Sequence, residues 1–404
     1  MAELLSVADA LSRVLADAQP LPAVEVPLAE AHGRVLAANL AARRTQPPAA
    51  VSAMDGYAVR GSDIAQIPAR LKVIGEVPAG KPFDHSVGTG DAARIFTGGV
   101  LPTGTDTVVI QEHTSRLGDA IVVNKTTAAG KNVRAEGLDF KQGDILFRRG
   151  HRLTSRDLSL VATMNYPSVP VHRAPRVALF ATGDELVAPG TTPGPGQIVY
   201  SNGFALMALM RAEGAAVIDL GIVRDLRDDT IAAVRRARES GANILVTTGG
   251  ASVGDYDLVQ GALAAEGMAL SFWRIAMRPG RPLMNGRLGP MHVLGLPGNP
   301  VSSYVCGVLF VAPLIRKLTG RSDLEPQMED AVLGSDLAEN DERADYMRAT
   351  IVRRADGIQV ATPFPTQDSS TMGRLAKADC LLVRDAHAPA AKAGTRCRIV
   401  KLGF

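Results

Sequence analysis

Cysteine, histidine and excess charge are all scarce in this sequence, and each shortage narrows the class of protein. The 404 residues include three cysteines that form no CxxC pair, so we expect a protein of the reducing cytoplasm without a disulfide framework. The seven histidines show no HxxxH spacing, which argues against a transition-metal centre. The formal net charge is +3, with lysine and arginine scattered along the chain, so no nucleic-acid partner is expected.

Long hydrophobic runs and several enzyme motifs are missing as well. The first 20 residues lack the basic and apolar regions of a signal peptide. The longest apolar run, 301–315, contains two serines and a proline and is too short to cross a bilayer, so it predicts a buried helix and no membrane association. The absence of GxxxxGK(S/T) excludes P-loop hydrolysis, and the lack of GxSxG or a Cys–His pair argues against a nucleophilic hydrolase.

The rhythm of apolar segments predicts a globular chain with several domains. Hydrophobic residues make up 46% and charged residues 21%, and 404 residues exceed one ordinary core. Residues 46–124 contain short alternating runs between Gly- and Pro-containing turns, which predict a small β-rich domain. Residues 1–45 and 125–175 predict a mixed connecting domain, including a helix that begins near Ser6 with Asp9 three residues later.

The second half of the chain divides into an α/β domain and a β domain. From 176 to 325, apolar strands alternate with helical patterns, which predicts right-handed crossovers and a parallel sheet covered by helices on both faces. From 326 to 404 short strands return and predict a compact β domain.

Polar and glycine-rich segments follow one strand after another in the α/β domain. Ligands of an open parallel sheet bind beyond the carboxyl ends of its strands, so these segments are expected to meet. Glycine backbone N–H groups can bind phosphate oxygens, and Mg²⁺ takes one or two carboxylates together with phosphate oxygens. We therefore predict a site for a phosphate or pyrophosphate ester and Mg²⁺, with Asp225 and Asp257 as metal ligands. Other residues expected there are Glu185, Gly249, Gly250, Ser252, Pro297 and Pro300.

Several of these residues also have a simpler interpretation, which for Pro297 and Pro300 is a role in shaping a loop. Asp225 and Asp257 suit the N-caps of helices, which for a single acid is the better interpretation. Gly249 and Gly250 suit a tight turn with close helix packing. The convergence of several such segments on one sheet edge is what favours a ligand site.

Three arginines, at 274, 278 and 281, lie within eight residues of the same domain. Arg278 and Arg281 flank a Pro-Gly turn that can direct both guanidinium groups at one oxyanion. A solvated basic loop is the simpler alternative, and charge alone slightly favours it.

Several strings, in order, resemble the molybdopterin molybdenumtransferase family, called MoeA in bacteria and related to the E domain of gephyrin. The resemblance covers nearly the whole chain. Its strings are SAMDGYAVR, RIFTGGVLPTGTDTVVIQE, ATGDEL, TTGGASVGDYD, MRPGRP, GLPGNPVSS, DYMRA and DSSTMGRLAKADC.

The resemblance implies a fold, a reaction and a set of partners. The fold has four domains: an elongated connecting domain, a small β-rich domain, a three-layer α/β/α molybdopterin-binding domain and a C-terminal β-barrel-like domain. The enzyme takes adenylylated molybdopterin and molybdate, cleaves the anhydride with Mg²⁺, releases AMP and inserts molybdenum. It is a cytoplasmic homodimer with a cleft shared between subunits, in transient contact with the adenylyltransferase and with molybdoenzyme-maturation proteins.

The resemblance also assigns roles to residues of this chain. Asp225, Asp257, Glu185 and Arg348 are implied to be catalytic. Asp55 and Thr97 are implied to reach the cleft from the small domain, and Arg278, Arg281, Arg348 and Ser370 to surround molybdate. Many family members have lysine where this chain has arginine at 274, 278 and 281, a change that keeps the charge but alters how an oxyanion is held.

Two other functions remain open at this point. One is a molybdopterin-binding or scaffold protein without turnover, which the intact acids at 185, 225 and 257 argue against. The other is a nucleotide pyrophosphatase on the same α/β core, which the β domains and the SAMDGYAVR string disfavour.

Overall fold

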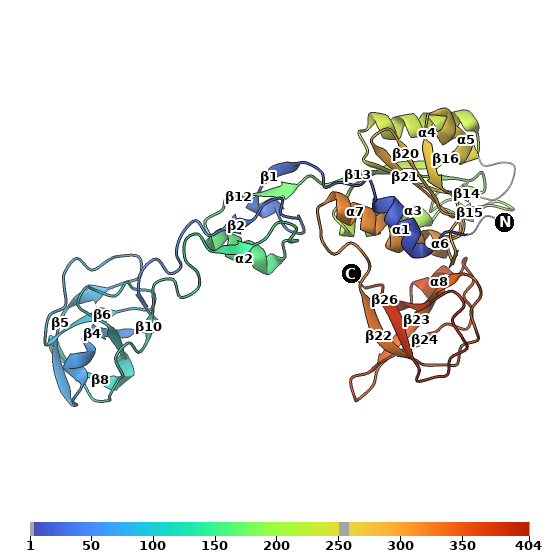
Figure 1. Cartoon of the computed structure of the whole chain (residues 1–404). Helices are drawn as coiled ribbons and strands as arrows, with labels where there is room; N and C mark the ends of the chain where they lie inside the picture. The colour runs from blue at the N-terminus through green and yellow to red at the C-terminus, as the bar shows by residue number, and fades with distance from the viewer. Residues whose placement is uncertain (1–3, 250–257, 404) are drawn as a thin grey trace.

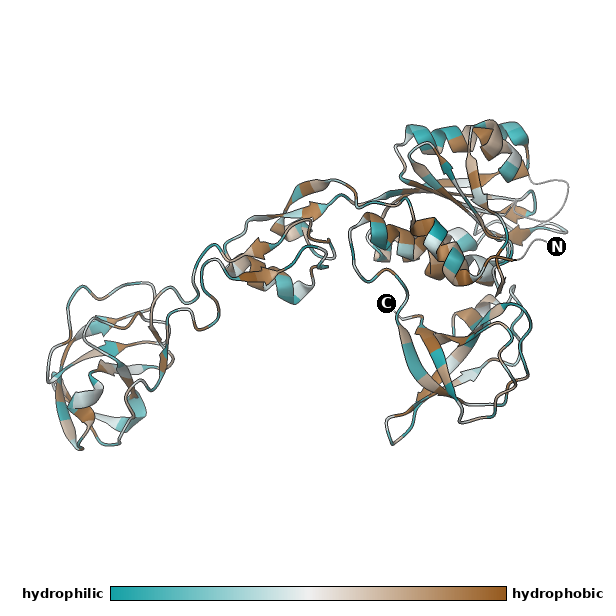
Figure 2. Ribbon diagram, in the orientation of Figure 1, coloured by the Kyte–Doolittle hydropathy of each residue, from teal (hydrophilic) through white to brown (hydrophobic). Residues whose placement is uncertain are grey.

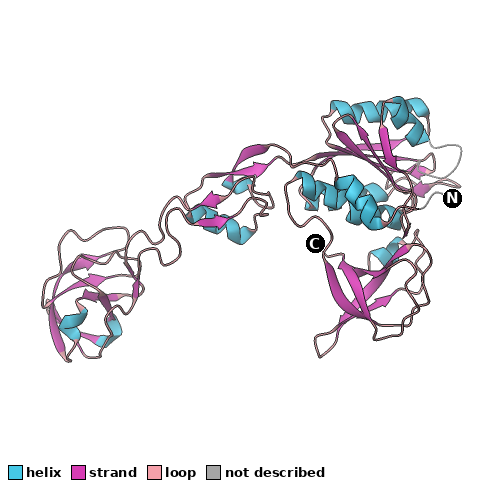
Figure 3. Cartoon of the chain, in the orientation of Figure 1, coloured by secondary structure: helices cyan, strands magenta, loops and turns pink. Residues whose placement is uncertain are grey.

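The computed structural model describes residues 4–249 and 258–403 and shows an elongated molecule. Figure 1 shows a β-rich part at one end, a slender connecting part in the middle, and an α/β part beside a C-terminal β part at the other end. Figure 3 shows strands in all four parts, with most of the helix in the α/β part.

The distal part is a six-stranded sheet around a small apolar core. Its strand order is β7-β4-β6-β5-β9-β8, and only β5 and β6 pair in parallel. Alternating side chains such as Tyr57, Leu71 and Ile121 fill the core, as the period-2 pattern predicts. The strands are β4 (Gly56–Val59), β5 (Ala69–Val77), β6 (Asp91–Ile95), β7 (Thr107–Ile110), β8 (Thr114–Leu117) and β9 (Ala120–Val123), with short 3-10 turns η2 (Gly61–Ile64) and η3 (Gln111–His113).

The connecting part is built from two passes of the chain, one outward and one returning. Each outward strand pairs with a returning one, giving the pairs β1–β12, β2–β11 and β3–β10. Helix α2 (Ser155–Thr163) begins with a capping box between Thr154 and Asp157. The strands are β1 (Ala23–Pro27), β2 (Leu40–Ala41), β3 (Val51–Ser52), β10 (Val133–Arg134), β11 (Ile145–Phe147) and β12 (Ser168–His172), with η1 at Leu28–Glu30.

The α/β part has the predicted three layers. Its sheet order is β16-β13-β17-β21-β20-β18, in which the first four strands are parallel and the last two antiparallel. Figure 2 shows the hydrophobic strands lying between helices whose outer surfaces carry hydrophilic residues. The strands are β13 (Arg176–Thr182), β16 (Ala216–Val223), β17 (Ile244–Thr248), β18 (Ala269–Phe272), β20 (Met284–Leu288) and β21 (Met291–Leu296), and a short pair, β14 (Leu186–Val187) with β15 (Ile198–Val199), lies outside the sheet.

Helices cover both faces of this sheet. Helices α4 (Arg227–Glu239) and α5 (Leu258–Ala265) pack on one face, and α3 (Asn202–Ala212), α6 (Pro300–Cys306) and α7 (Ala312–Leu318) pack on the other. A π-helical turn, Gly307–Val311, joins α6 to α7. Within the described residues, 300–318 is the one helix with the length and apolarity to cross a membrane, and 83% of its apolar window is buried, as in a core helix.

The first helix departs from the prediction. Helix α1 (Val7–Leu15) begins at Ser6, whose side chain accepts the Asp9 N–H as expected. We expected it to pack with the connecting part, but Ala10, Leu11 and Val14 belong to the core of the α/β part, where the helix contacts α7. Its apolar face matches any hydrophobic groove, so sequence periodicity did not determine which domain it joins.

The C-terminal part is a closed β structure, in agreement with the barrel-like prediction. Strands β23, β24, β22, β26 and β25 form a ring that the β23–β25 pairing closes, and β19 from the α/β part adds to β23. The strands are β19 (Met277–Arg278), β22 (Met328–Leu333), β23 (Ala344–Arg353), β24 (Gln359–Pro363), β25 (Cys380–Arg384) and β26 (Arg396–Lys401), with a short helix α8 (Met372–Leu375).

Candidate active site

A cavity of about 760 Å³ lies at the carboxyl ends of the parallel strands, where the α/β part meets the C-terminal part. Residues after β13, β16, β17 and β21 line it, together with Ser370 and Met372 from the C-terminal part. The structure therefore brings together seven of the twelve expected residues that it describes: Glu185, Asp225, Gly249, Arg281, Pro297, Pro300 and Ser370.

Asp225 is held by the end of β13, and it does not cap a helix. The Thr182 hydroxyl donates to one carboxylate oxygen of Asp225, and the Asp184 N–H donates to the other at 3.3 Å. The Asp225 N–H donates in return to the Asp184 carboxylate at 3.1 Å. Helix α4 starts two residues later, with Leu226 at the N-cap position and no side-chain cap. The simpler interpretation of Asp225 is therefore wrong.

Glycines allow the strand ends to approach closely around this carboxylate. Gly249 has φ +85°, and a Cβ there would lie 2.2 Å from the Thr182 carbonyl oxygen. A Cβ on Gly183 would lie 2.6 Å from both carboxylate oxygens of Glu185. A side chain at 249 would collide with backbone, and one at 183 would force the Glu185 carboxylate to move, so both glycines shape the site.

The Pro297–Pro300 loop is fixed from two directions. The Asn202 side chain donates to the Gly298 carbonyl at 2.6 Å, and the Val301 N–H donates to the Ser369 carbonyl at 3.0 Å. Pro300 occupies the start of α6, where a missing N–H costs nothing. Sequence reasoning missed Asn202, which is the first residue of α3.

The three arginines that were expected to bind an oxyanion have different surroundings. Arg281 is exposed and lines the cavity, and no hydrogen bond or ion pair joins it to another described residue. Arg274 is exposed, lies over the Trp273 ring at 5.3 Å and does not line the cavity.

Arg278 is engaged by acids of the C-terminal part. Its Nε and Nη2 donate to the two carboxylate oxygens of Asp345 at 2.7 and 2.5 Å, and its Nη1 donates to Asp341 at 3.3 Å. These bonds, led by the one to Asp345, raise the pKa of Arg278 above its ordinary value. Arg278 therefore joins the α/β part to the C-terminal part, and sequence spacing offered no signal for these partners.

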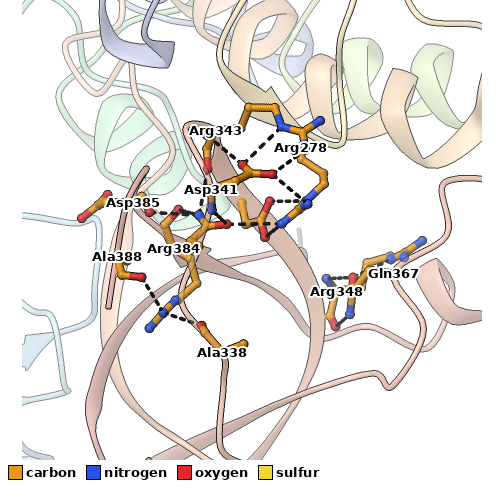
Figure 4. A network of polar contacts seen from close by, with 11 residues as sticks. Arg278, Ala338, Asp341, Arg343, Arg348, Gln367, Arg384, Asp385 and Ala388 are labelled. Carbon is orange, nitrogen blue, oxygen red and sulfur yellow. Dashed lines mark hydrogen bonds and ion pairs between the residues drawn. The ribbon is translucent and has the colours of Figure 1, made fainter. Parts of the chain in front are cut away.

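Arg348, on β23, is only 1% exposed and lies behind the segment 366–371, which carries Ser370. Its guanidinium donates to the Asp368 carbonyl at 2.8 Å and to the Thr371 hydroxyl at 3.2 Å. Burial and the neighbouring Arg374 lower the pKa of Arg348, and the Asp368 charge opposes them. Figure 4 shows Arg348 facing Gln367, apart from the cluster around Arg278.

The two residues expected from the distal part lie together but far from this cavity. The Thr97 N–H and hydroxyl both donate to one oxygen of Asp55 at 2.7 Å. These bonds lower the pKa of Asp55. Asp55 directly precedes β4, at the opposite end of the molecule from the cavity (Figure 1). The remaining expected residues, Gly250, Ser252 and Asp257, lie outside the described residues.

Family comparisons identify the class of protein that carries this fold and cavity. Three family models match in order: the MoeA N-terminal region (domain I and II) over residues 5–165, the probable molybdopterin binding domain over 178–317, and the MoeA C-terminal region (domain IV) over 330–402. The cavity lies between the last two regions. The fold and site thus define a protein of molybdenum cofactor biosynthesis.

Comparison with curated relatives narrows the class. The chain is 41% identical over 303 residues to the molybdopterin molybdenumtransferase of Nostoc sp., covering 73% of this chain and 69% of the relative. It is 35% identical over 358 residues to that of Haemophilus influenzae, covering 88% of each. The chain belongs to the molybdopterin molybdenumtransferase family and is an enzyme. The family, the fold class and the enzymatic activity predicted from sequence are confirmed.

A solved structure agrees over the whole length. The crystal structure of a molybdopterin biosynthesis MoeA protein from Pyrococcus horikosii is 28% identical, has a TM-score of 0.85 and covers 100% of both chains. The four-part architecture is thus shared with that protein.

Proposed function

We propose that the cavity binds adenylylated molybdopterin and molybdate, and that the enzyme inserts molybdenum as it cleaves the phosphoanhydride and releases AMP. The observation that carries the proposal is the meeting of carboxylates, glycine-bounded turns and an exposed arginine in one cavity. A substrate with a phosphoanhydride, joined by a separate oxyanion, needs both kinds of group.

The carboxylates fit a hydrated Mg²⁺. Each oxygen of Asp225 accepts one hydrogen bond and keeps a free lone pair, and Glu185 lines the same cavity. Among the described residues, no group of three acidic, histidine or cysteine side chains could hold a metal alone. Mg²⁺ needs no such group, because it keeps waters and takes phosphate oxygens beside one or two carboxylates. When bound, it supplies charge that polarises the phosphoanhydride.

The remaining chemistry is positioning. We assign the oxyanion to Arg281 and Ser370, which line the cavity, and the phosphate oxygens to the backbone near Gly249. Attack by water or by a molybdate oxygen on the phosphorus of the pterin phosphate forms one P–O bond and breaks the bond to the bridging oxygen, which leaves with AMP. A thiol nucleophile is not part of the proposal, because Cys306 and Cys380 are buried and burial raises both pKa values.

A homodimer would explain how Asp55 and Thr97, in the distal part, can act at a cavity. Asp55 and Thr97 cannot reach the cavity of their own chain in this conformation, so the distal part of one subunit is proposed to overhang the partner's cavity. Mixing Asp55→Ala and Asp225→Asn subunits tests this directly. Each variant alone is expected to be nearly inactive, and mixed dimers are expected to recover activity, because one cavity then has both intact residues.

AMP release is the test of the reaction. Purified enzyme incubated with adenylylated molybdopterin, Mg²⁺ and molybdate is expected to release AMP, and a chelator is expected to stop it. Asp225→Asn, which keeps the size of the side chain, is expected to lower the rate at least 100-fold, on the scale of losing one strong electrostatic contact in a transition state. Confirmed substrate binding without any AMP release would exclude the proposed reaction.

A further inference from the structure

Arg348 is a buried cation with an unusual set of partners. Its guanidinium donates to the carbonyls of Thr366 and Asp368 and to the Thr371 hydroxyl, at 2.8–3.5 Å. Among the described residues, no carboxylate forms an ion pair or a hydrogen bond with it. Buried charges are commonly paired with an opposite charge, so this surrounding needs an explanation.

Gln367 contributes most to that surrounding. Its Oε1 accepts from the Arg348 backbone N–H at 2.9 Å and from Nε at 3.3 Å. Its Nε2 donates to the Arg348 carbonyl at 3.0 Å and to the Phe364 carbonyl at 2.9 Å. One neutral amide therefore fixes both the backbone and the side chain of Arg348, as Figure 4 shows.

The carboxylate of Asp368 binds Ser370 and not Arg348. One oxygen of the Asp368 carboxylate accepts from the Ser370 N–H at 2.8 Å and from the Ser370 hydroxyl at 2.5 Å. A second cation, Arg374, donates to the Thr366 carbonyl at 2.9 Å. Two cations, Arg348 and Arg374, thus donate to segment 366–371, whose one carboxylate is bound to Ser370, so the positive charges outnumber the negative one.

We propose that Gln367 is a positioning residue for the transfer reaction: it holds Arg348 with a neutral side chain, so that the charge of Arg348 stays available to the oxyanion at Ser370. This inference rests on the proposed binding of molybdate. A carboxylate at 367 would hold the guanidinium equally well but cancel its charge, and because Arg348 is buried, that difference is screened less than it would be between exposed groups. Gln367 was absent from the residues expected from sequence.

The experiment compares Gln367→Glu with Gln367→Met by calorimetric titration of the pterin-free enzyme with molybdate. Gln367→Glu is expected to weaken molybdate binding roughly 10- to 100-fold, the size of a lost charge-assisted interaction. Gln367→Met keeps the neutrality but loses the hydrogen bonds, so it is expected to lower the melting temperature and weaken binding only a few-fold. Gln327→Glu adds the same charge at an exposed position of the same part and is expected to match the wild type.

Turnover gives a second readout that general damage would not reproduce. The KM for molybdate in Gln367→Glu is expected to rise in step with the dissociation constant, while kcat at saturating molybdate stays within about twofold, the pattern of a uniform binding loss. Wild-type affinity in Gln367→Glu, or equal losses in Gln367→Glu and Gln367→Met, overturns the inference and leaves the proposed function intact. Failure of the wild-type enzyme to bind molybdate overturns both.

Discussion

Arg278 and Arg348 are both associated with the C-terminal part, yet their surroundings differ in kind. Arg278 is half-exposed and donates to the carboxylates of Asp345 and Asp341. Arg348 is buried and donates only to neutral acceptors. From exposure alone, the half-exposed Arg278 would be assigned to a ligand and the buried Arg348 to the fold. The contacts indicate instead that Arg278 joins two parts of the molecule, whereas Arg348 has no ion-pair partner among the described residues.

The difference bears on Arg278 and Arg281, the two arginines of the MRPGRP string. A guanidinium can bind both oxygens of one carboxylate, which an ammonium group cannot do in the same geometry. Arg278 uses this property on Asp345. Arg281 has no such partner among the described residues and faces the cavity. We therefore expect arginine at 278 to stabilise the fold and arginine at 281 to bind the oxyanion.

Of the substitutions that test this comparison, removal of Arg348 should have the largest effect on stability and on molybdate binding. Arg348→Ala leaves a cavity and several unpaired acceptors in segment 366–371, so we expect the free energy of unfolding to fall by about 3 kcal/mol. Molybdate binding should become undetectable because the Ser370 segment loses its support. Denaturant unfolding and titration calorimetry measure the two effects. A variant of unchanged stability would show that the buried contacts contribute little.

Arg281→Ala should separate binding from stability. This side chain is exposed and has no partner among the described residues, so we expect an unchanged melting temperature and a molybdate KM raised about 10-fold or more. Thermal unfolding and steady-state kinetics on one preparation give both values. An unchanged KM would remove Arg281 from the oxyanion site.

Arg278→Lys should slightly lower stability and leave molybdate binding nearly unchanged, which is the reverse of the result expected for Arg281→Ala. Loss of the two-oxygen contact with Asp345 is expected to lower the free energy of unfolding by about 1 kcal/mol, the upper range for a partly exposed ion pair. Molybdate affinity should stay within about threefold of the wild type, since the charge is retained and committed to acids. If affinity falls as far as in Arg281→Ala, Arg278 is a ligand and the comparison fails.

Acidic pH should slightly weaken the ion pairs that Asp341 forms with Arg278 and Arg343. The bond to Arg343, with the charges of Arg278 and Arg343, lowers the pKa of Asp341 from 3.8 to about 2. A carboxyl group with a depressed folded pKa stabilises the protein above its unfolded pKa and loses that contribution as pH falls from about 4 to about 2. The wild type should therefore lose slightly more stability than Asp341→Asn over this range, and equal losses by denaturant unfolding at each pH would contradict this.

Sequence patterns predicted the regular elements better than the contacts between them. The helix cap at Ser6 and the alternation of strands and helices in the α/β part follow from local rules, and the structure shows both. The destination of α1 could not be predicted, because its apolar face carries no information about its partner. Among candidate site residues of the α/β part, those shortly after a parallel strand met in one cavity, since parallel strands end at a common edge.

Contacts between distant parts were beyond such rules. Arg278 and Asp345 are 67 residues apart, and only the addition of β19 to β23 brings them into register. Gln367 bonds to Arg348 from a loop 19 residues away, and a lone glutamine in a polar loop gives no sequence signal. Thr182 next to Asp225 depends likewise on the neighbouring positions of β13 and β16.

The most direct measurement is the position of molybdate in crystals of the enzyme, located by the anomalous scattering of molybdenum. We expect one principal peak in the cavity, within contact distance of Arg281 and Ser370, with the Arg278–Asp345 pair undisturbed. A peak bound by Arg278, with Asp345 displaced, would contradict it.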